Sequence, residues 1–380
     1  MKVEQFVRLA DTSWSAGFPG ALADLAQLVL VFGARRFLDD QGLMGQIETA
    51  YPAAHLLGCS TAGEIAGASV QDDSLVVTAT VFENARLAAA EIDLAQAADS
   101  FDAGQRLAAG LETQGLVHAM VISDGLGVNG SELVRGLSNG LPARVGITGG
   151  LAADGERFQR TLVYTGGGAG ERKAAVIGFY GQGLRIGYGS MGGWDAFGPD
   201  RLITRSNANV LYEMDGQSAL DLYKLYLGEQ AANLPACGLF FPLSVRKSRN
   251  DTGVVRAVLS VNEAERSMTF AGDMPVGSHA RLMRANLERL IDGAQGAAQV
   301  ARQGSAAAGE PELAILISCV ARKVVLKQRV EEEVEAVRDV FGERAVLAGF
   351  YSYGEISPFT PSGKCELHNQ TMTITTFSEN

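Results

Sequence analysis

Residues 349–358 read GFYSYGEISP, and residues 58–65 carry nearly the same octet, GCSTAGEI. Four positions match at identical spacing: Gly58 with Gly349, Gly63 with Gly354, Glu64 with Glu355, and Ile65 with Ile356. The residue two places before the second glycine carries a hydroxyl in both copies, Thr61 or Ser352. The same octet near each end of the chain predicts an internal duplication.

The octets belong to longer segments that share one layout. Three apolar runs predict buried strands: 28–33, 118–125 and 313–322. Each run is followed by a helical stretch and by a second strand that ends in a Gly-rich turn. Thr-rich extended runs come after the first and third units, at 74–82 and 369–377. Buried strands joined by helices indicate a sheet with helical crossovers, and the duplication extends well beyond eight residues.

The length of the chain, 380 residues, predicts two domains. Gly-rich segments between the octets predict antiparallel strands joined by tight turns, including a hairpin turn at GGG, 166–168. Apolar residues at helical spacing predict a long helix over 279–303. We therefore predict a mixed α/β (α+β) fold built from two pseudo-duplicated halves, residues 1–205 and 206–380.

Composition and charge exclude several classes of partner. The chain is 47% hydrophobic and 20% charged, with a formal net charge of -11, so we expect no binding to nucleic acid or to an anionic membrane surface. It has neither a signal-peptide pattern nor an apolar run long enough to span a membrane, which predicts a cytoplasmic protein. Four cysteines without a CxxC pair predict free thiols in a reduced compartment.

Motifs of the common enzyme classes are absent from the sequence. It contains no Gly-x-Ser-x-Gly elbow, Walker loop or HExxH motif, so we predict that the protein is not an enzyme. One alternative stays open, a hydrolase that pairs Cys319 or Cys59 with His368 as nucleophile and base. Cys365 lies just before the last strand and can also belong to a thiol site, although buried cysteines that serve as small apolar residues are commoner.

Several polar residues in or near the repeats are candidates for a ligand site. Glu64 and Glu355 can accept N–H bonds of their own turns, or they can face a shared cleft as two equivalent acceptors. Arg322 can neutralise an anionic ligand or cap a strand end, and Trp194 can line a pocket or the core. The expected ligand-binding set is Gly63, Glu64, Gly149, Gly150, Trp194, Arg322, Tyr351, Tyr353, Gly354, Glu355 and Asn369.

Motifs along almost the whole chain resemble FIST domains. LLGCSTAGEI, DGLGVNGSELVRGL, ARVGITGGLAADG and the GGW segment are similar to the N-terminal half of that family. FPLSV, LMRANLERLIDGA, ISCVARK, GFYSYGEISP and LHNQTMTIT are similar to its C-terminal half. The resemblance implies a sensory module that binds a small ligand such as an amino acid. It implies regulation of a separate signalling protein, since no output domain is expected within these residues.

Stand-alone FIST proteins include the nitric-oxide-sensing haemoproteins known as NosP. Similarity to that group implies a non-covalent haem b, a gaseous ligand and a partner histidine kinase in trans. His368 is then the expected haem ligand and His279 the second choice, although a structural role remains open for both. The alternative is a FIST-type sensor of a small organic ligand without haem, in which Glu64 and Glu355 hold the ligand.

Overall fold

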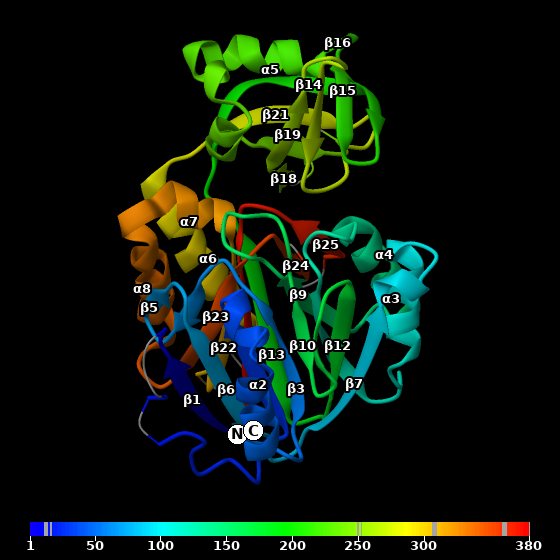
Figure 1. The fold of residues 1–380 in the computed structure, drawn as a ribbon. Coiled ribbons are helices and arrows are strands. Elements are labelled where there is room, and N and C mark those ends of the chain that lie inside the picture. The colour runs from blue at the N-terminus through cyan, green and yellow to red at the C-terminus, as the bar shows by residue number, and fades with distance from the viewer. Residues whose placement is uncertain are drawn as a thin grey trace.

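Three six-stranded sheets and one eight-stranded sheet form the described part of the chain. The computed structural model describes residues 1–10, 14–15, 17–248, 251, 253–305, 310–358 and 363–379. Figure 1 shows the three six-stranded sheets gathered in one large body, with the eight-stranded sheet in a smaller body beside it. The two bodies have separate apolar cores.

The three six-stranded sheets share one strand order. An edge strand comes first, then an antiparallel strand, then two parallel strands, and last a hairpin. The first sheet is β1 (Lys2–Arg8), β6 (Leu75–Val81), β2 (Leu28–Gly33), β3 (His55–Ser60), β10 (Val163–Thr165) and β11 (Gly168–Gly170). The second is β7 (Arg86–Asp93), β12 (Lys173–Tyr180), β8 (Leu116–Ser123), β9 (Gly146–Leu151), β24 (Gly354–Pro358) and β25 (Cys365–His368). The third is β13 (Leu184–Met191), β26 (Met372–Glu379), β22 (Leu313–Cys319), β23 (Val346–Ser352), β4 (Glu64–Ala66) and β5 (Ser69–Gln71).

The hairpin of each sheet comes from a different unit of the chain. The first unit gives β4 and β5 to the third sheet, the second gives β10 and β11 to the first, and the third gives β24 and β25 to the second. This cyclic exchange makes the large body pseudo-threefold. The mixed α/β class is confirmed, and the duplication seen in the sequence is part of a repeat of three units.

The three turns that follow the second parallel strands meet around the pseudo-threefold axis. The backbone N–H of Ala62 donates to the oxygen of Tyr351 (2.8 Å), that of Ala153 to Ser60 (2.8 Å), and that of Tyr353 to Leu151 (3.4 Å). Residues 149–156, GGLAADGE, are therefore the third copy of the octet. In that copy Asp154 stands where the other two have glycine, and Gly155 stands where they have glutamate.

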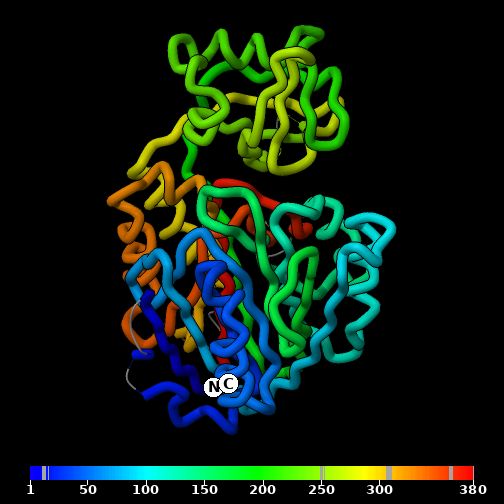
Figure 2. Tube along the Cα trace, in the orientation of Figure 1, coloured from blue at the N-terminus to red at the C-terminus, as the bar shows by residue number. Residues whose placement is uncertain are grey.

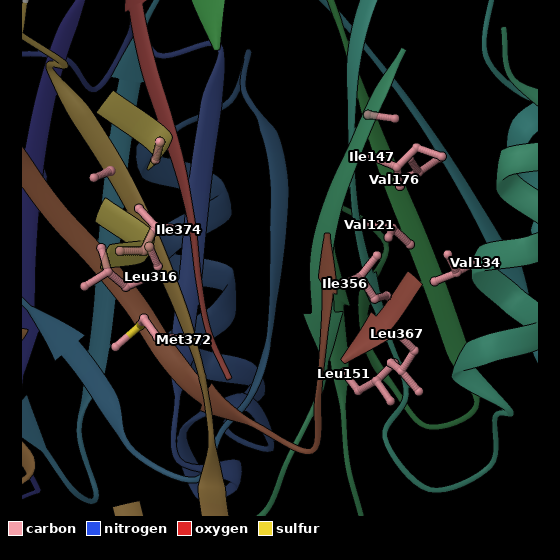
Figure 3. Packing of buried hydrophobic residues seen from close by; sticks show 14 of the residues in the cluster. Val121, Val134, Ile147, Leu151, Val176, Leu316, Ile356, Leu367, Met372 and Ile374 are labelled. Carbon is pink, nitrogen blue, oxygen red and sulfur yellow. The ribbon is translucent and has the colours of Figure 1, made fainter. Parts of the chain in front are cut away.

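Helices cover the outer faces of these sheets. They are α1 (Arg35–Leu38), α2 (Gln41–Ala50), α3 (Ser100–Ala109), α4 (Gly130–Gly140), α6 (Leu287–Ser305), α7 (Val320–Leu326) and α8 (Val330–Phe341). Side-chain oxygens of Asp40, Asp99 and Asn129 accept N–H bonds from the first turns of α2, α3 and α4, which fixes where these helices begin. Figure 3 shows apolar side chains of the second and third sheets, including Ile356 of the exchanged hairpin, within one buried cluster.

The smaller body is inserted between β13 and α6 of the third unit. It contains β14 (Asp195–Asn207), β15 (Val210–Met214), β16 (Gln217–Ser218), α5 (Ala219–Leu227), β17 (Leu243–Arg246), β18 (Val254–Arg256), β19 (Val258–Asn262), β20 (Ser267–Phe270) and β21 (His279–Arg284). Figure 2 follows the chain as it leaves the large body, forms this inserted body and returns. The predicted boundary between residues 205 and 206 falls within β14.

The long helix predicted over 279–303 begins later than its sequence pattern indicates. Residues 279–284 form β21 instead, paired with β14 and β17, and α6 starts at Leu287. Ala280 and Leu282 are buried while His279, Arg281 and Met283 are partly exposed, which is the alternation of a strand. The prediction was wrong there because tertiary pairing outweighs helical spacing over one short segment. The predicted hairpin turn at 166–168 is confirmed between β10 and β11.

Candidate functional site

A pocket lies at the carboxyl ends of the parallel strands β2 and β3, beside the first octet turn. We call it the first-turn pocket. It has a volume of about 410 Å³, and its lining residues are Ala34, Arg35, Arg36, Asp39, Thr61, Ala62, Gly63, Glu64, Asp72, Asp73, Gly155 and Arg157. Ligands of α/β sheets commonly bind outside the carboxyl ends of parallel strands. The pocket therefore lies where this architecture favours binding.

Charged groups of both signs line the first-turn pocket. Arg35 and Arg157 approach one oxygen of Asp154, with nitrogen–oxygen distances of 3.6 and 3.9 Å, and Arg36 pairs with Asp73. Arg36 and Arg157 are about half exposed, so their guanidinium groups remain accessible from the pocket. Asp72 pairs with Lys323 of α7 and is 76% exposed. Positive and negative charges are therefore present together.

Asp154 fixes the position of the second unit's turn, in residues 149–156, beside the pocket. Its carboxylate is buried and accepts N–H bonds from Phe158, Gln159 and Arg160, at 2.9, 3.1 and 3.0 Å. The hydroxyl of Tyr353 also donates to it, and the ring of Tyr353 stacks on Phe158 with centroids 4.3 Å apart. Asp154 therefore holds the loop that places Arg157 at the pocket.

Glu64 is held by Thr61 of its own turn and by Ser74, just before β6. Its carboxylate accepts hydrogen bonds from the Thr61 hydroxyl, from the Ser74 N–H (3.1 Å) and from the Ser74 hydroxyl (2.7 Å). Burial raises the pKa of Glu64 to about 7, and these hydrogen bonds oppose the rise. Gly63 has a φ of 132°, a backbone conformation that residues with a side chain rarely adopt, so the turn favours glycine. The backbone N–H comes from Ser74, ten residues along the chain, and not from the turn of Glu64 itself, and Glu64 also lines the pocket.

Glu355 has the equivalent environment in the third unit. It accepts hydrogen bonds from the Ser352 hydroxyl (2.9 Å), the Thr371 N–H (3.0 Å) and the Thr371 hydroxyl (2.9 Å). Burial raises its pKa to about 8. Glu355 is fully buried and is not among the residues that line the first-turn pocket. The two glutamates are thus matched anchors of two turns.

Comparison with known families agrees with this architecture. Residues 27–217 match the FIST N domain, and residues 219–358 match the FIST C domain. The chain belongs to the FIST family. FIST domains are sensor domains of signal transduction that bind small ligands. The two matches meet near residue 218, between β16 and α5 of the inserted body.

Other comparisons add little to the FIST assignment. A crystal structure of cyanuric acid hydrolase from A. caulinodans is similar at 10% sequence identity and a TM-score of 0.39, with coverage of 100% of this chain and 99% of that chain. No curated protein matches this chain. None of the helices in the described ranges is long and apolar enough to cross a membrane.

The other residues predicted for the ligand site are mostly parts of the packed core of this FIST protein. Arg322 is fully buried and ion-paired with Glu333, and Tyr351 donates its hydroxyl to Glu333 at 2.7 Å. The indole N–H of Trp194 donates to the backbone oxygen of Gln370 at 2.9 Å. At Gly149, Gly150 and Gly354 an added side chain would meet neighbouring strands. Asn369 lies buried between β25 and β26.

The surroundings of His368 do not fit a haem in this structure. The ring is fully buried, and its Nε2 lies 2.8 Å from the backbone oxygen of Ser357. Burial lowers its pKa to about 4, which keeps the imidazole neutral. His279, the second choice, lies in β21 of the inserted body.

A second pocket, lined in part by His55, has a volume of only about 250 Å³. Among the described residues, no group of three or more His, Cys, Asp or Glu side chains is placed to hold a metal ion.

The cysteines are free, as predicted, but they lack the properties of nucleophiles. Cys59 and Cys319 are buried, and burial raises the pKa of both thiols well above the usual value. A nucleophilic cysteine needs a lowered pKa and access to its substrate. These environments therefore do not favour the hydrolase alternative.

Most of the residues that line the first-turn pocket were not predicted from the sequence. Only Gly63 and Glu64 were predicted. The charged residues come from four separate segments, and hairpin exchange is needed to bring Arg157 of the second unit to the first. One signal was available, because aligning GGLAADGE with the two known octets identifies residues 149–156 as a third copy of the turn.

Glutamine in place of Glu355 is expected to change how stability depends on pH. The pKa of Glu355 is raised from 4.5 to about 8, so the folded protein keeps a proton that the unfolded chain releases. That contribution to stability is fully present below pH 4.5 and is lost as pH rises toward 8. The stability difference between Glu355→Gln and wild type should therefore shift in favour of the variant by up to about 5 kcal/mol between acid and pH values above 8. Urea unfolding across this pH range measures the effect.

Two further variants serve as references for that measurement. Glu64→Gln should give the same type of gain, completed near pH 7, because the pKa of Glu64 is raised to about 7. The exposed Glu265→Gln should leave the pH dependence unchanged. Parallel curves for wild type and Glu355→Gln would mean that Glu355 is ionised at no penalty in the folded protein.

Proposed function

We propose that this FIST protein senses a small zwitterionic molecule, such as an amino acid, in the first-turn pocket. The observation that carries the proposal is the presence of arginines and aspartates together around about 410 Å³. Pockets for small ligands typically occupy ~300–1,000 Å³. An amino acid carries one carboxylate and one ammonium group, and the pocket offers partners for both.

The two kinds of charge have separate roles in this proposal. Arg36 and Arg157 are the most exposed arginines of the pocket and would bind the carboxylate, because guanidinium groups match carboxylates in geometry and charge. Asp72 and Asp73, which are 76% and 57% exposed, would accept hydrogen bonds from the ammonium group. Arg35 is less exposed and would hold Asp154 in place.

A path from the pocket to a partner protein runs through α7. Lys323 of α7 donates to the oxygen of Ala62 (2.9 Å) and pairs with Asp72. Val325 and Leu326, at the C-terminal end of α7, pack with Phe240 of the inserted body. A ligand that competes for Asp72 would release Lys323 and shift the balance between two positions of α7. We propose that a histidine kinase or another signalling protein in trans reads this change.

Haem b and nitric oxide stay predictions from the resemblance, although the surroundings of His368 do not fit a haem in this structure. The absorption spectrum of protein purified from haem-supplemented cells tests them directly. A Soret band that moves when nitric oxide is added and is lost in His368→Ala would support a haem sensor. A featureless spectrum would favour the small organic ligand.

Glutamine in place of Arg157 is expected to weaken amino-acid binding about tenfold or more. Loss of one charged hydrogen bond to a ligand weakens binding by about 1.5–3 kcal/mol, and 1.4 kcal/mol is a factor of ten. Isothermal titration of wild type with the common amino acids identifies the ligand, and the same titration of Arg157→Gln measures the loss. Arg135→Gln, at an exposed arginine of α4, is the matched control. Equal affinity in both variants, or no binding to wild type, would exclude this site for amino acids.

A further inference from the structure

The third unit contains a position equivalent to one wall of the first-turn pocket. Ser74 and Thr371 each give an N–H and a hydroxyl to the glutamate of their own unit. The residues just before them, Asp73 and Gln370, both have left-handed backbones, with φ of 59° and 62°. Asn369 therefore corresponds to Asp72. We call residues 368–371 the HNQT loop.

Asn369 and Gln370 of the HNQT loop have buried polar atoms without partners in the part of the chain that the structure describes. Asn369 and Gln370 are both 0% exposed. Among the described residues, neither Nδ2 nor Oδ1 of Asn369 has a hydrogen-bond partner, and the same holds for Oε1 of Gln370. Nε2 of Gln370 donates to the oxygen of Leu239 at 3.3 Å. Unpaired buried polar atoms destabilise a protein, so such a group of three indicates a missing partner.

The inserted body covers this loop, whereas the equivalent wall of the first-turn pocket is open. Leu239 belongs to the 3-10 helix η3 (Ala236–Phe240) of the inserted body. Arg256 of β18 donates to the oxygen of Leu367 at 2.8 Å, just before the loop. Asp72, by contrast, is 76% exposed. A molecule at the HNQT loop would thus be enclosed between the large body and the inserted body.

The charged groups next to the loop already have partners. Glu355 is satisfied by Ser352 and Thr371, Arg322 is paired with Glu333, and Arg256 donates to the backbone oxygens of Leu367 and Asp273. A charged ligand would have to displace these partners, so a neutral molecule fits better. The Asn369 amide offers donors beside an acceptor, and Gln370 adds another acceptor. An amide edge, with N–H next to C=O, is complementary to that arrangement.

We propose that the HNQT loop and the inserted body enclose a second ligand site, for a small neutral molecule with an amide edge. Nδ2 of Asn369 donates to the ligand carbonyl, and Oδ1 of Asn369 and Oε1 of Gln370 accept from the ligand N–H groups. Entry requires the inserted body to move away from the loop. This site is separate from the first-turn pocket in position and in charge. The two proposals are therefore tested independently, and the failure of one leaves the other unaffected.

Fluorescence of Trp194 tests the proposal, because its indole N–H binds the Gln370 backbone oxygen. The chain has two tryptophans, so Trp14→Phe leaves Trp194 as the only reporter. Titration uses acetamide, which has an amide edge, and acetate, which has the same shape and a charge, each up to about 100 mM, where even a weak fragment binds. We expect a saturable change with acetamide and at least tenfold weaker binding of acetate. No saturable change with acetamide, or equal affinity for both, would overturn the proposal.

Asn369→Leu separates a ligand site from a structural asparagine. We expect the variant to bind acetamide at least tenfold more weakly and to keep or raise its melting temperature, because an unpaired polar group is replaced by an apolar one of similar size. Asn209→Leu is the matched control, since Asn209 donates to the Phe270 oxygen at 2.8 Å. It should melt at a lower temperature and bind acetamide normally. Unchanged acetamide binding in Asn369→Leu, or a melting temperature lowered as in the control, would overturn the proposal.

Should Asn369→Leu fail to fold, Asn369→Asp provides the second test. It keeps the shape of the side chain and removes the donor for the ligand carbonyl. Loss of the acetamide response in a folded Asn369→Asp protein supports the site, and an undiminished response overturns it.

Discussion

Alanine in place of Gly349 is expected to destabilise the protein by ~3 kcal/mol or more. Gly349 of β23 lies opposite Leu316 of β22, its parallel neighbour. A methyl group at Gly349 would collide with the backbone oxygen of Leu316, and a backbone atom in a paired strand cannot move aside as a flexible side chain can. The two central strands of the third sheet would have to separate. Urea unfolding measures the loss of free energy.

The same collision is built into the other two units. A side chain at Gly58 would meet the oxygen of Val31, and one at Gly149 would meet that of Val121. Alanine at either position should therefore destabilise to a similar degree. Gly45→Ala is the matched control, because nothing lies within 4 Å of the added group in the middle of α2. It should stabilise the protein by about 0.5–1 kcal/mol. A Gly349→Ala protein as stable as wild type would mean that β22 and β23 can pair without the close approach of their backbones at Gly349.

This shared glycine explains why the sequence predicted so much of the fold. The close approach of parallel strands leaves no choice of residue at that position, so the octet stayed recognisable in two units. In the second unit the turn is held differently. Its carboxylate is Asp154, which accepts N–H bonds from the loop that follows, whereas Glu64 and Glu355 accept from the residue that precedes the next strand. The third copy was not recognised from the sequence because its carboxylate, Asp154, stands one position earlier than Glu64 and Glu355 do in the other two copies.

Hairpin exchange and the inserted body could not be predicted from these patterns. A short strand such as β4 has the same sequence pattern whether it pairs within its own unit or with β23 of the third unit. Only long-range packing decides between the two. The inserted body interrupts the third unit between β13 and α6, which hides the threefold spacing of the units along the chain.

The polar residues show a similar division between what is local and what is not. The bond from the Thr61 hydroxyl to Glu64 is local, but the N–H that Glu64 was predicted to accept from its own turn comes from Ser74, ten residues along the chain. The pairing of Arg157 with Asp154 beside Arg35 depends on two units meeting. Arg322 was predicted to bind a ligand or cap a strand. Its burial depends on α6, α8 and the segment before Trp194, which no local pattern around Arg322 reveals.

Methionine in place of Arg322 is expected to destabilise the protein by about 3–5 kcal/mol, because it leaves the buried carboxylate of Glu333 without its counter-charge. Two nitrogens of Arg322 donate to Glu333, at 2.9 and 2.7 Å, and one also donates to the Leu290 oxygen at 2.7 Å. The guanidinium group also reaches the oxygen of Gly192, at the start of the inserted body. Chemical denaturation measures the change.

A double variant distinguishes an uncompensated charge from lost packing. Glu333 also accepts from Tyr351 and Ser318, at 2.7 and 3.1 Å, so Glu333→Gln keeps hydrogen bonds for those hydroxyls while removing the charge. If the unpaired carboxylate is the main cause, Arg322→Met with Glu333→Gln should be more stable than Arg322→Met alone. If the contacts of Arg322 with Gly192 and Leu290 dominate, the double variant will be no more stable than the single one. If Arg322→Met were as stable as wild type and lost only ligand binding, Arg322 would be a ligand-binding residue, as the sequence predicted, and not a structural one.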